Sequence, residues 1–242
     1  MGEWHAVAGR WREAAARFTA VLQLNQFGDL DVSTTDFLKC GALLIELGDL
    51  EGYEGLRQEG IARFGDSRKM YVGERITKVS LLLPAADGVN KSMAPLVAVQ
   101  TNAEFDPLNR YRSEQAAWSS LSLALVEYRK DNRARAVEWY VRCLAFLPDS
   151  RVRIATARII LAMARHQLQQ ADAAESEFAQ GCEIIESKFR SGLGMDEDIF
   201  GRWFDWLIAR ILLREATSLI GGAACREHAA EAGRLNGMLT PP

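Results

Sequence analysis

Apolar residues recur along most of the chain at helical spacing, and this spacing groups them into pairs of helices. The two clearest pairs cover roughly residues 113–147 and 152–189. In both pairs, small residues stand where two helices must approach closely: Ala124, Ala136, Ala162 and Ala174. Stacked copies of one helical hairpin bury a continuous core, because each hairpin covers the apolar face of its neighbour. The pattern therefore predicts an all-α, right-handed solenoid of about five hairpins.

The first hairpin is incomplete at its N-terminal side. Its first helix covers only residues 1–7, a turn follows at Gly9, and the second helix carries Trp11 and Phe18 on an apolar stripe. A helix of two turns is too short to be stable alone, and a solenoid normally ends in a unit with a polar outer face. We therefore expect residues 1–24 to expose an apolar patch that docks on an upstream domain or forms a homodimer.

The second and third hairpins have clearer turns. In the second hairpin, we expect Asp36 to cap the first helix, residues 47–50 to form the turn and Gly65 to end the second helix. The third hairpin is degenerate, with one helix predicted over 72–83 and one over 91–104. Pro95 is compatible with the second of these only in its first turn.

A strongly apolar helix is predicted over 203–220, before Gly221 and Gly222. We expect it to be a capping helix that packs on the fifth hairpin, with arginines that keep part of its surface in contact with solvent. The helical repeat domain then covers residues 1–222. Residues 223–242 are expected to form a C-terminal tail or a loose helix.

Composition and cysteine usage narrow the class of protein. The chain has 242 residues and a formal charge of −3, and it lacks the run of about 18 apolar residues that a membrane-spanning helix needs. The first residues lack the features of a signal peptide. The cysteines are far apart in the sequence and form no paired motif: Cys40, Cys143, Cys182 and Cys225. This spacing argues against a structural metal or a disulfide framework and favours a reducing cytoplasm.

The sequence contains no recognisable catalytic or cofactor-binding motif. The histidines share no metal-ligand spacing: His5, His166 and His228. The glycines of 192–194 lack the third glycine and the preceding strand of a phosphate-binding loop, and the acidic run 196–198 lacks the spacing of a calcium loop. We therefore expect a protein that is not an enzyme and that binds no cofactor or metal. A hydrolase or transferase with an unrecognised site is the competing hypothesis.

Two groups of residues carry a family resemblance. The strings Gly9-Arg10-Trp11-Arg12-Glu13-Ala14, Gly41…Gly48-Asp49-Leu50 and Ala136…Tyr140…Pro148 are similar to the small, aromatic and proline positions of the tetratricopeptide repeat. The stretches 38–53, 81–84 and 205–216 resemble a module at the C-terminal ends of planctomycete-type bacterial serine/threonine kinases. Together these similarities cover most of residues 8–220.

The resemblance implies a protein-interaction role in signalling. Tetratricopeptide proteins line a concave groove with the first helix of each hairpin, and the groove holds a peptide or an amphipathic helix. We expect a non-enzymatic scaffold of this kind. The alternative is a cis-acting regulatory region of a larger kinase-type protein. Kinase activity itself is not implied, because the glycine-rich loop and the HRD and DFG motifs are absent.

Two surfaces are candidate partner sites. The groove positions are expected at Leu121, Leu125, Tyr128, Arg129, Ile159, Met163 and His166. The competing interpretation is that these residues are buried core, because stripes at helical spacing are more often core than ligand sites. The second surface is a basic stripe that would orient an acidic or phosphorylated partner: Arg129, Arg133, Arg158 and Arg165.

The basic stripe comes from an uneven distribution of charge. Residues 129–165 carry nine Lys/Arg against three Asp/Glu, whereas residues 25–66 carry three against nine. The competing interpretation is that adjacent layers of the solenoid carry charges of opposite sign and attract one another, so that the arginines bind no partner. Nucleic-acid binding is not expected, because the whole chain is acidic and lacks a nucleic-acid motif.

Overall fold

The computed structural model describes residues 1–24, 29–101, 110–146, 150–194 and 202–221. Within these ranges, all regular secondary structure is α-helical and no strand occurs. The prediction of an all-α chain is confirmed. The helices are α1 (Gly2–Val7), α2 (Trp11–Leu24), α3 (Leu30–Glu46), α4 (Leu50–Phe64), α5 (Met70–Ser80), α6 (Asp87–Ser92), α7 (Ala94–Thr101), α8 (Arg110–Arg129), α9 (Arg133–Ala145), α10 (Arg151–Gln167), α11 (Ala171–Ser191) and α12 (Trp203–Ile220).

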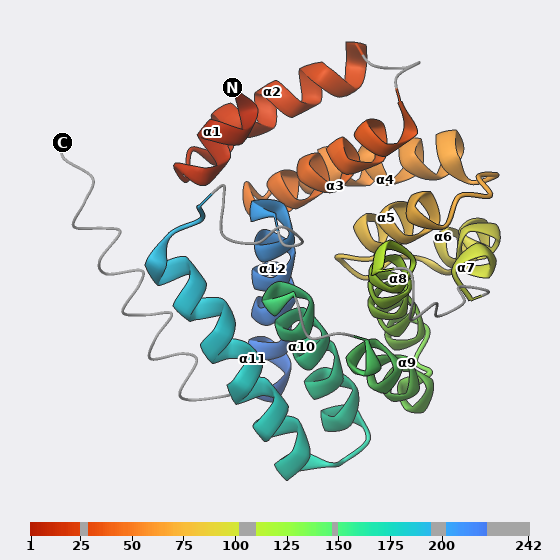
Figure 1. Ribbon diagram of the computed structural model, residues 1–242, viewed down its shortest axis with the longest axis vertical. Coiled ribbons are helices and arrows are strands. Elements are labelled where there is room, and N and C mark those ends of the chain that lie inside the picture. Colours follow the sequence, from red (N-terminus) through yellow and green to blue (C-terminus); the bar gives the residue numbers. More distant parts are fainter. Residues whose placement is uncertain (25–28, 102–109, 147–149, 195–201, 222–242) are drawn as a thin grey trace.

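The helices pack against their neighbours in the chain and curve around α12. The contacts run from α2 to α3, then to α5, α8 and α10. Helix α4 packs beside α3 and α5, α7 beside α5 and α8, α9 beside α8 and α10, and α11 beside α10 and α12. Figure 1 shows α12 in the middle of this arrangement, with α3 and α4 on one side and α10 and α11 on another. The tight packing of α12 against α10 and α3 joins parts of the chain that are far apart in sequence.

Several predicted turns occur where the sequence places them. Gly9 and Gly48 have positive φ values of 72° and 74°, a conformation that costs glycine little because it has no Cβ. Gly221 ends α12 with a φ of 76° in the left-handed region. Helix α4 ends before Gly65, as predicted, although this glycine remains right-handed with a φ of −54°.

The predicted start of α3 is wrong. The helix begins at Leu30 rather than near residue 36, and the side chain of Asp29 accepts hydrogen bonds from the backbone N–H groups of residues 31 and 32. Asp36 instead lies inside the helix, buried, and its carboxylate is 3.0 Å from Lys39 Nζ. An aspartate that is paired with a lysine one turn away is therefore not available as a cap.

The third hairpin also departs from the expectation. The predicted helix over 72–83 is α5, which ends at Ser80, and the predicted helix over 91–104 is split into α6 and α7. Pro95 lies in the first turn of α7. A backbone N–H at that position would have no acceptor within the helix, so its absence in proline breaks no hydrogen bond. Residues 102–104 lie outside the described ranges.

Small residues allow the closest helix contacts. A Cβ on Gly41 of α3 would lie 2.3 Å from Val79 Cγ2 of α5, and one on Gly181 of α11 would lie 2.7 Å from Ile159 Cδ1 of α10. Both distances are shorter than any real contact of a Cβ atom. The two helix pairs can therefore approach this closely only because glycine has no Cβ. The alanines expected at helix contacts are also buried: Ala124, Ala136, Ala162 and Ala174.

Helix α12 is a central element and not a cap. It packs on the fifth hairpin, α10 and α11, as expected, but it also packs on α3 at the other end of the chain. Eleven of its residues are buried, including Trp203, Trp206 and Leu212. A helix that is apolar around most of its circumference belongs in a core. The expected capping role on the last hairpin alone is therefore wrong.

The C-terminal tail expected over 223–242, and Cys225 within it, lie outside the described residues. Cys40 and Cys143 are free and buried. Cys182 of α11 is disulfide-bonded. This cysteine departs from the expectation drawn from cysteine spacing, and the reducing compartment stays a prediction. None of the described helices is both long enough and apolar enough to cross a membrane.

Candidate interaction surfaces

The residues expected to line a groove are mostly buried. They lie on α8 and α10. Leu121 and Leu125 belong to the sides of α3, α5, α8 and α10 that are turned toward α12, which we call the inner face, whereas Ile159 packs against Gly181 of α11. The apolar members expose at most 6% of their surface: Leu121, Leu125, Tyr128, Ile159 and Met163. His166 is half-buried near the end of α10. These positions are therefore part of the core, as the competing interpretation holds.

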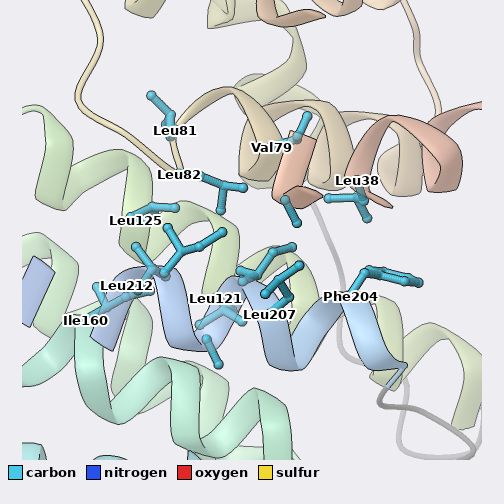
Figure 2. Packing of buried hydrophobic residues seen from close by; sticks show 14 of the residues in the cluster. Leu38, Val79, Leu81, Leu82, Leu121, Leu125, Ile160, Phe204, Leu207 and Leu212 are labelled. Carbon is cyan, nitrogen blue, oxygen red and sulfur yellow. The ribbon is translucent and has the colours of Figure 1, made fainter. Parts of the chain in front are cut away.

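Helix α12 covers the inner face with apolar side chains. Figure 2 shows Leu207 and Leu212 of α12 among Leu121 and Leu125 of α8 and Ile160 of α10. All five are buried. Burial of a leucine or isoleucine side chain contributes about 1.5–3 kcal/mol relative to exposure. The apolar contacts of α12 are therefore a large part of the core and not a loose association.

A buried ionic cluster attaches α12 to α5. Lys78 Nζ lies 2.7 Å from the Glu74 carboxylate and 3.5 Å from that of Asp205, and all three side chains are less than a tenth exposed. The Trp118 ring covers the same ammonium at 4.4 Å. Burial raises the pKa of Asp205 although Lys78 opposes this effect. Burial alone would lower the pKa of Lys78, but the two carboxylates outweigh it and the pKa is raised.

A second polar contact attaches α12 to α8. Both terminal nitrogens of Arg129 contact the Glu215 carboxylate, one of them at 2.7 Å. The same guanidinium donates hydrogen bonds of 3.0 Å to the carbonyl oxygens of Leu81 and Leu82, which follow α5. Arg129 was expected to face a partner, but its side chain is only 5% exposed. Its donors are used within the chain.

Two arginines of α12 point in the other direction, toward the end of α3. Arg210 Nη2 lies 2.6 Å from a Glu46 carboxylate oxygen, and Arg214 contacts the other oxygen of that carboxylate. The Arg210 guanidinium also lies 3.9 Å from the centre of the Phe189 ring of α11 and 5.8 Å from the Trp11 ring of α2. Arg210 therefore links the first and the last hairpins, and burial lowers its pKa.

Trp203 of α12 closes the N-terminal hairpin. Its ring centre lies 6.5 Å from that of Trp11 and 5.9 Å from that of Phe18, and its indole N–H donates to the Glu3 carboxylate. Lys39 joins the same group, with its Nζ 2.7 Å from Glu3. We expected Trp11 and Phe18 to need a neighbour outside the chain. That expectation is wrong for these two side chains, because α12 supplies the neighbour.

The remaining arginines of the expected basic stripe are also paired. Arg133 contacts Asp131 at 2.9 Å and donates to Gln167. Arg158 and Arg165 share the carboxylate of Glu177 on α11, at 2.5 and 3.5 Å. These cations connect neighbouring helices, as the competing interpretation of alternating charge holds. The structure does not bring the four arginines together as one open stripe.

A different face of the same region is open. Val141 is 57% exposed and Leu144 is 41% exposed on α9, and Val137 is half-buried beside them. The spacing of four and three residues places the three side chains on one side of the helix. Arg135 and Arg142 are exposed along the same helix, and Arg142 also lies over the Trp139 ring at 5.1 Å. By the same spacing, the two arginines lie on nearly the opposite side of the helix from this stripe. We call Val137, Val141 and Leu144 the α9 face.

The α9 face was missed in the sequence although a signal for it exists. Ala136, Tyr140 and Cys143 form the buried stripe of α9. Val141 and Leu144 lie outside that stripe and are exposed, so these two apolar residues exceed what packing requires, whereas Val137 packs at the edge of the core. We assigned partner binding to the first helices of the hairpins by family resemblance. An outward apolar stripe on a second helix was therefore not considered.

Other chemistry and other similarities do not add a site. Among the described residues, no group of three or more His, Cys, Asp or Glu side chains is arranged to hold a metal ion. A scan against protein-family models found no match to the sequence, and a search of curated proteins found none either. The two surfaces described above, the inner face with α12 and the α9 face, are therefore the basis for a functional proposal.

Proposed function

We propose that this chain is a non-enzymatic protein-interaction module that binds its partner through the α9 face. One observation carries the proposal: the inner face is covered by α12, whereas α9 exposes Val141 and Leu144. Exposed apolar side chains that lie together on one side of a helix are typical of interaction sites. The proposal keeps the scaffold role expected from the sequence and moves the binding surface from the groove to the outside.

The proposed architecture is a solenoid of tetratricopeptide-like hairpins closed around its own last helix. Supporting it are the succession of contacts from α2 through α10 and the close approach of helices at Gly41 and Gly181. The tetratricopeptide resemblance rests on small residues at such positions. In this proposal α12 takes the place that a bound helix has in an open repeat protein.

Binding in the groove is the less favourable alternative. A partner helix there would first have to displace α12, which would expose Trp206, Leu207 and Leu212 and leave the Arg129 guanidinium without its carboxylate. Exposure of each large apolar side chain costs about 1.5–3 kcal/mol. Binding at the α9 face exposes no buried side chain, because that face is already in solvent.

The α9 face fits an amphipathic segment of a protein partner. Its exposed aliphatic side chains, Val141 and Leu144, supply the apolar contact. By helical spacing, exposed Glu138 is nearer to this stripe than Arg135 or Arg142. We therefore propose a protein or peptide that binds by its own apolar stripe, with the charges of α9 at a distance from the contact.

Affinity capture from native lysate with matched variants tests the proposal. The variant Val141→Gln/Leu144→Gln removes the apolar stripe with a good helix former and changes no charge. The control is Leu50→Gln, which alters a leucine of α4 that is also exposed. We expect at least one protein to be captured by the wild type and by the control and to be reduced at least tenfold with the α9 variant.

Two outcomes would contradict the proposal. Either the α9 variant captures the same proteins as the wild type in equal amounts, or the control loses them equally. Far-UV circular dichroism must show that both variants are folded, so that lost capture reports on the surface alone. The alternative function, a cis-acting regulatory region of a kinase-type protein, stays a prediction that no observation on the described residues favours.

A further inference from the structure

The ionic cluster that attaches α12 to α5 contains more acidic than basic groups. We call Glu74, Lys78 and Asp205 the Lys78 cluster. Within the described part of the chain, Lys78 is the only cation at ion-pair distance from either carboxylate, 2.7 Å from Glu74 and 3.5 Å from Asp205. One ammonium therefore faces two carboxylates. If both carboxylates are ionised, the cluster has an excess of one negative charge.

The Lys78 cluster is shielded from water. All three side chains are less than a tenth exposed, and the Trp118 ring of α8 covers the ammonium. Transfer of an unbalanced charge from water to an apolar interior is costly, and a buried carboxyl group avoids this cost by binding a proton. The excess of carboxylates and their burial therefore favour uptake of one proton by the cluster.

The other charged groups on the surrounding helices are paired elsewhere. Arg75, the neighbour of Glu74 in sequence, contacts Asp31 at 2.6 Å. On α8, Glu114 accepts a hydrogen bond of 2.6 Å from the indole N–H of Trp118. Helix α7 contains no charged residue. The remaining pairs are Asp36 with Lys39 on α3, Glu54 with Arg57 on α4, Arg153 of α10 with the Cys143 carbonyl oxygen, and Arg158 of α10 with Glu177 of α11.

Asp205 is the carboxyl group of the cluster that Lys78 compensates less. It is farther from the ammonium than Glu74 is. Its other oxygen accepts a hydrogen bond of 3.3 Å from the backbone N–H of Arg202, and its place in the first turn of α12 also favours the ionised form. Burial, assisted by the Glu74 carboxylate, outweighs these contacts and raises the pKa of Asp205.

We propose that Asp205 takes up a proton from solvent when the chain folds, and that closure of the inner face by α12 is therefore coupled to pH. The bound proton leaves a neutral Asp205 beside ionised Lys78 and Glu74. When this proton is lost, an unbalanced negative charge remains in the core and α12 is held less firmly. The inference goes beyond the proposed function and is independent of it, because it concerns α12 and not the α9 face.

The direction of the pH effect distinguishes this proposal from an ordinary ion pair. The unfolded chain loses the Asp205 proton near the ordinary pKa of about 4, and the folded chain loses it at higher pH. The stabilising contribution is therefore complete below about pH 4 and is lost as pH rises through the folded pKa. An ion pair that simply kept Asp205 ionised would lower its pKa, and stability would rise with pH instead.

The variant Asp205→Asn tests the proposal, because asparagine resembles the protonated aspartate in shape and charge. Urea unfolding of the full chain gives folding constants between about pH 4.5 and 9. We expect the ratio of the wild-type to the variant constant to fall with rising pH, by up to about tenfold per pH unit, until Asp205 is ionised. Asp31→Asn is the matched control, since Asp31 contacts Arg75 but is 63% exposed. Its ratio should change by less than about twofold.

NMR titration of the wild type is a second test that requires no variant to fold. With the aspartate carboxyl carbons labelled with ¹³C, and the signal of Asp205 assigned through its backbone resonances, Asp205 should titrate at higher pH than Asp31. A folding-constant ratio that rises with pH or stays constant would overturn the proposal. So would an Asp205 carboxyl that titrates at or below about pH 4. If Asp205→Asn does not fold, the wild-type titration alone decides.

Discussion

Arg129 of α8 and Glu215 of α12 form an ion pair in which two guanidinium nitrogens contact one carboxylate. The same arginine donates to the carbonyl oxygens of Leu81 and Leu82. This nearly buried side chain therefore joins α8, α12 and the segment after α5. It also donates hydrogen bonds to two carbonyl oxygens of that segment. Paired contacts of this kind fix position and orientation more strictly than single ones. The pair thus helps to set where α12 lies along the inner face.

We predict that Glu215→Gln lowers the free energy of unfolding by about 1–3 kcal/mol. The substitution removes the negative charge and replaces one acceptor oxygen by an NH2 donor, which faces an N–H of the buried Arg129 guanidinium. Urea unfolding followed by circular dichroism measures the change. Glu59→Gln, which changes an exposed glutamate in the middle of α4, is the control and should change stability by less than about 0.5 kcal/mol. Equal effects of the two substitutions would show that the Arg129–Glu215 pair contributes nothing specific.

We predict opposite effects for alanine at two helical glycines. At Gly41 a new Cβ would lie 2.3 Å from Val79 Cγ2, so Gly41→Ala must separate α3 from α5 and should destabilise the protein by about 1–3 kcal/mol. At Gly55 of α4 no atom lies within 4 Å of the new Cβ. Gly55→Ala should therefore stabilise by up to about 1 kcal/mol through helix propensity. Thermal unfolding of both variants tests the pair, and a stable Gly41→Ala protein would disprove the tight contact.

Stability should fall at alkaline pH in part because of Tyr128. Burial raises the pKa of Tyr128 to about 12, and the Glu215 carboxylate acts in the same direction. The unfolded chain loses this proton near its ordinary pKa of about 10. Because the folded pKa is the higher one, the stabilising contribution is complete below about pH 10 and is lost as pH rises through about 12.

The Tyr128→Phe variant isolates this effect. Urea midpoints measured between pH 8 and 11 should fall less steeply for the variant than for the wild type, because one ionisable group that favours the unfolded chain at high pH is gone. Tyr53, Tyr140 and Cys40 also have pKa values raised by burial, so the variant should keep part of the slope. Identical slopes for the two proteins would exclude Tyr128 as a contributor.

We predict that Trp203→Ala frees the N-terminal hairpin before the rest of the protein unfolds. The indole covers Trp11 and Phe18 and donates to Glu3, so its loss removes the cover of α1 and α2. Limited trypsin digestion should then cleave first after Arg12 and Arg17, at least tenfold faster than in the wild type. Trp4→Ala, at a tryptophan that is mainly exposed, is the control. Similar cleavage of both variants would mean that Trp203 does not hold the hairpin.

Much of the fold could be predicted from the sequence because local signals were strong. The helix over 203–220 and the turns at Gly9 and Gly48 follow from apolar periodicity and glycine conformation. The start of α3 was misplaced because two aspartates compete as caps, and the partner of Asp36 is another side chain of the same helix. The split between α6 and α7 has no signal in the periodicity, since both segments are short and only α7 is apolar.

The candidate site could be predicted less well. The periodicity identified Leu121, Leu125 and Ile159 as lining one face, but it could not show that α12 of the same chain covers the two leucines or that α11 packs on Ile159. That information lies in contacts between residues more than 80 positions apart, such as Arg129 with Glu215. The basic segment 129–165 was recognised correctly as a charge excess. Which of its arginines are paired depends on packing that no local pattern specifies.

Hydrogen exchange of the full wild-type chain tests the central claim most directly, namely that α12 is an integral helix that closes the inner face. We predict that the amides of residues 206–216 in α12 exchange with the same opening free energy as those of residues 157–164 in α10, because the two helices share one core. Exchange in α12 that is much faster than in α10, with α10 still protected, would contradict the account. It would show that α12 leaves the inner face readily and that the groove is open to a partner after all.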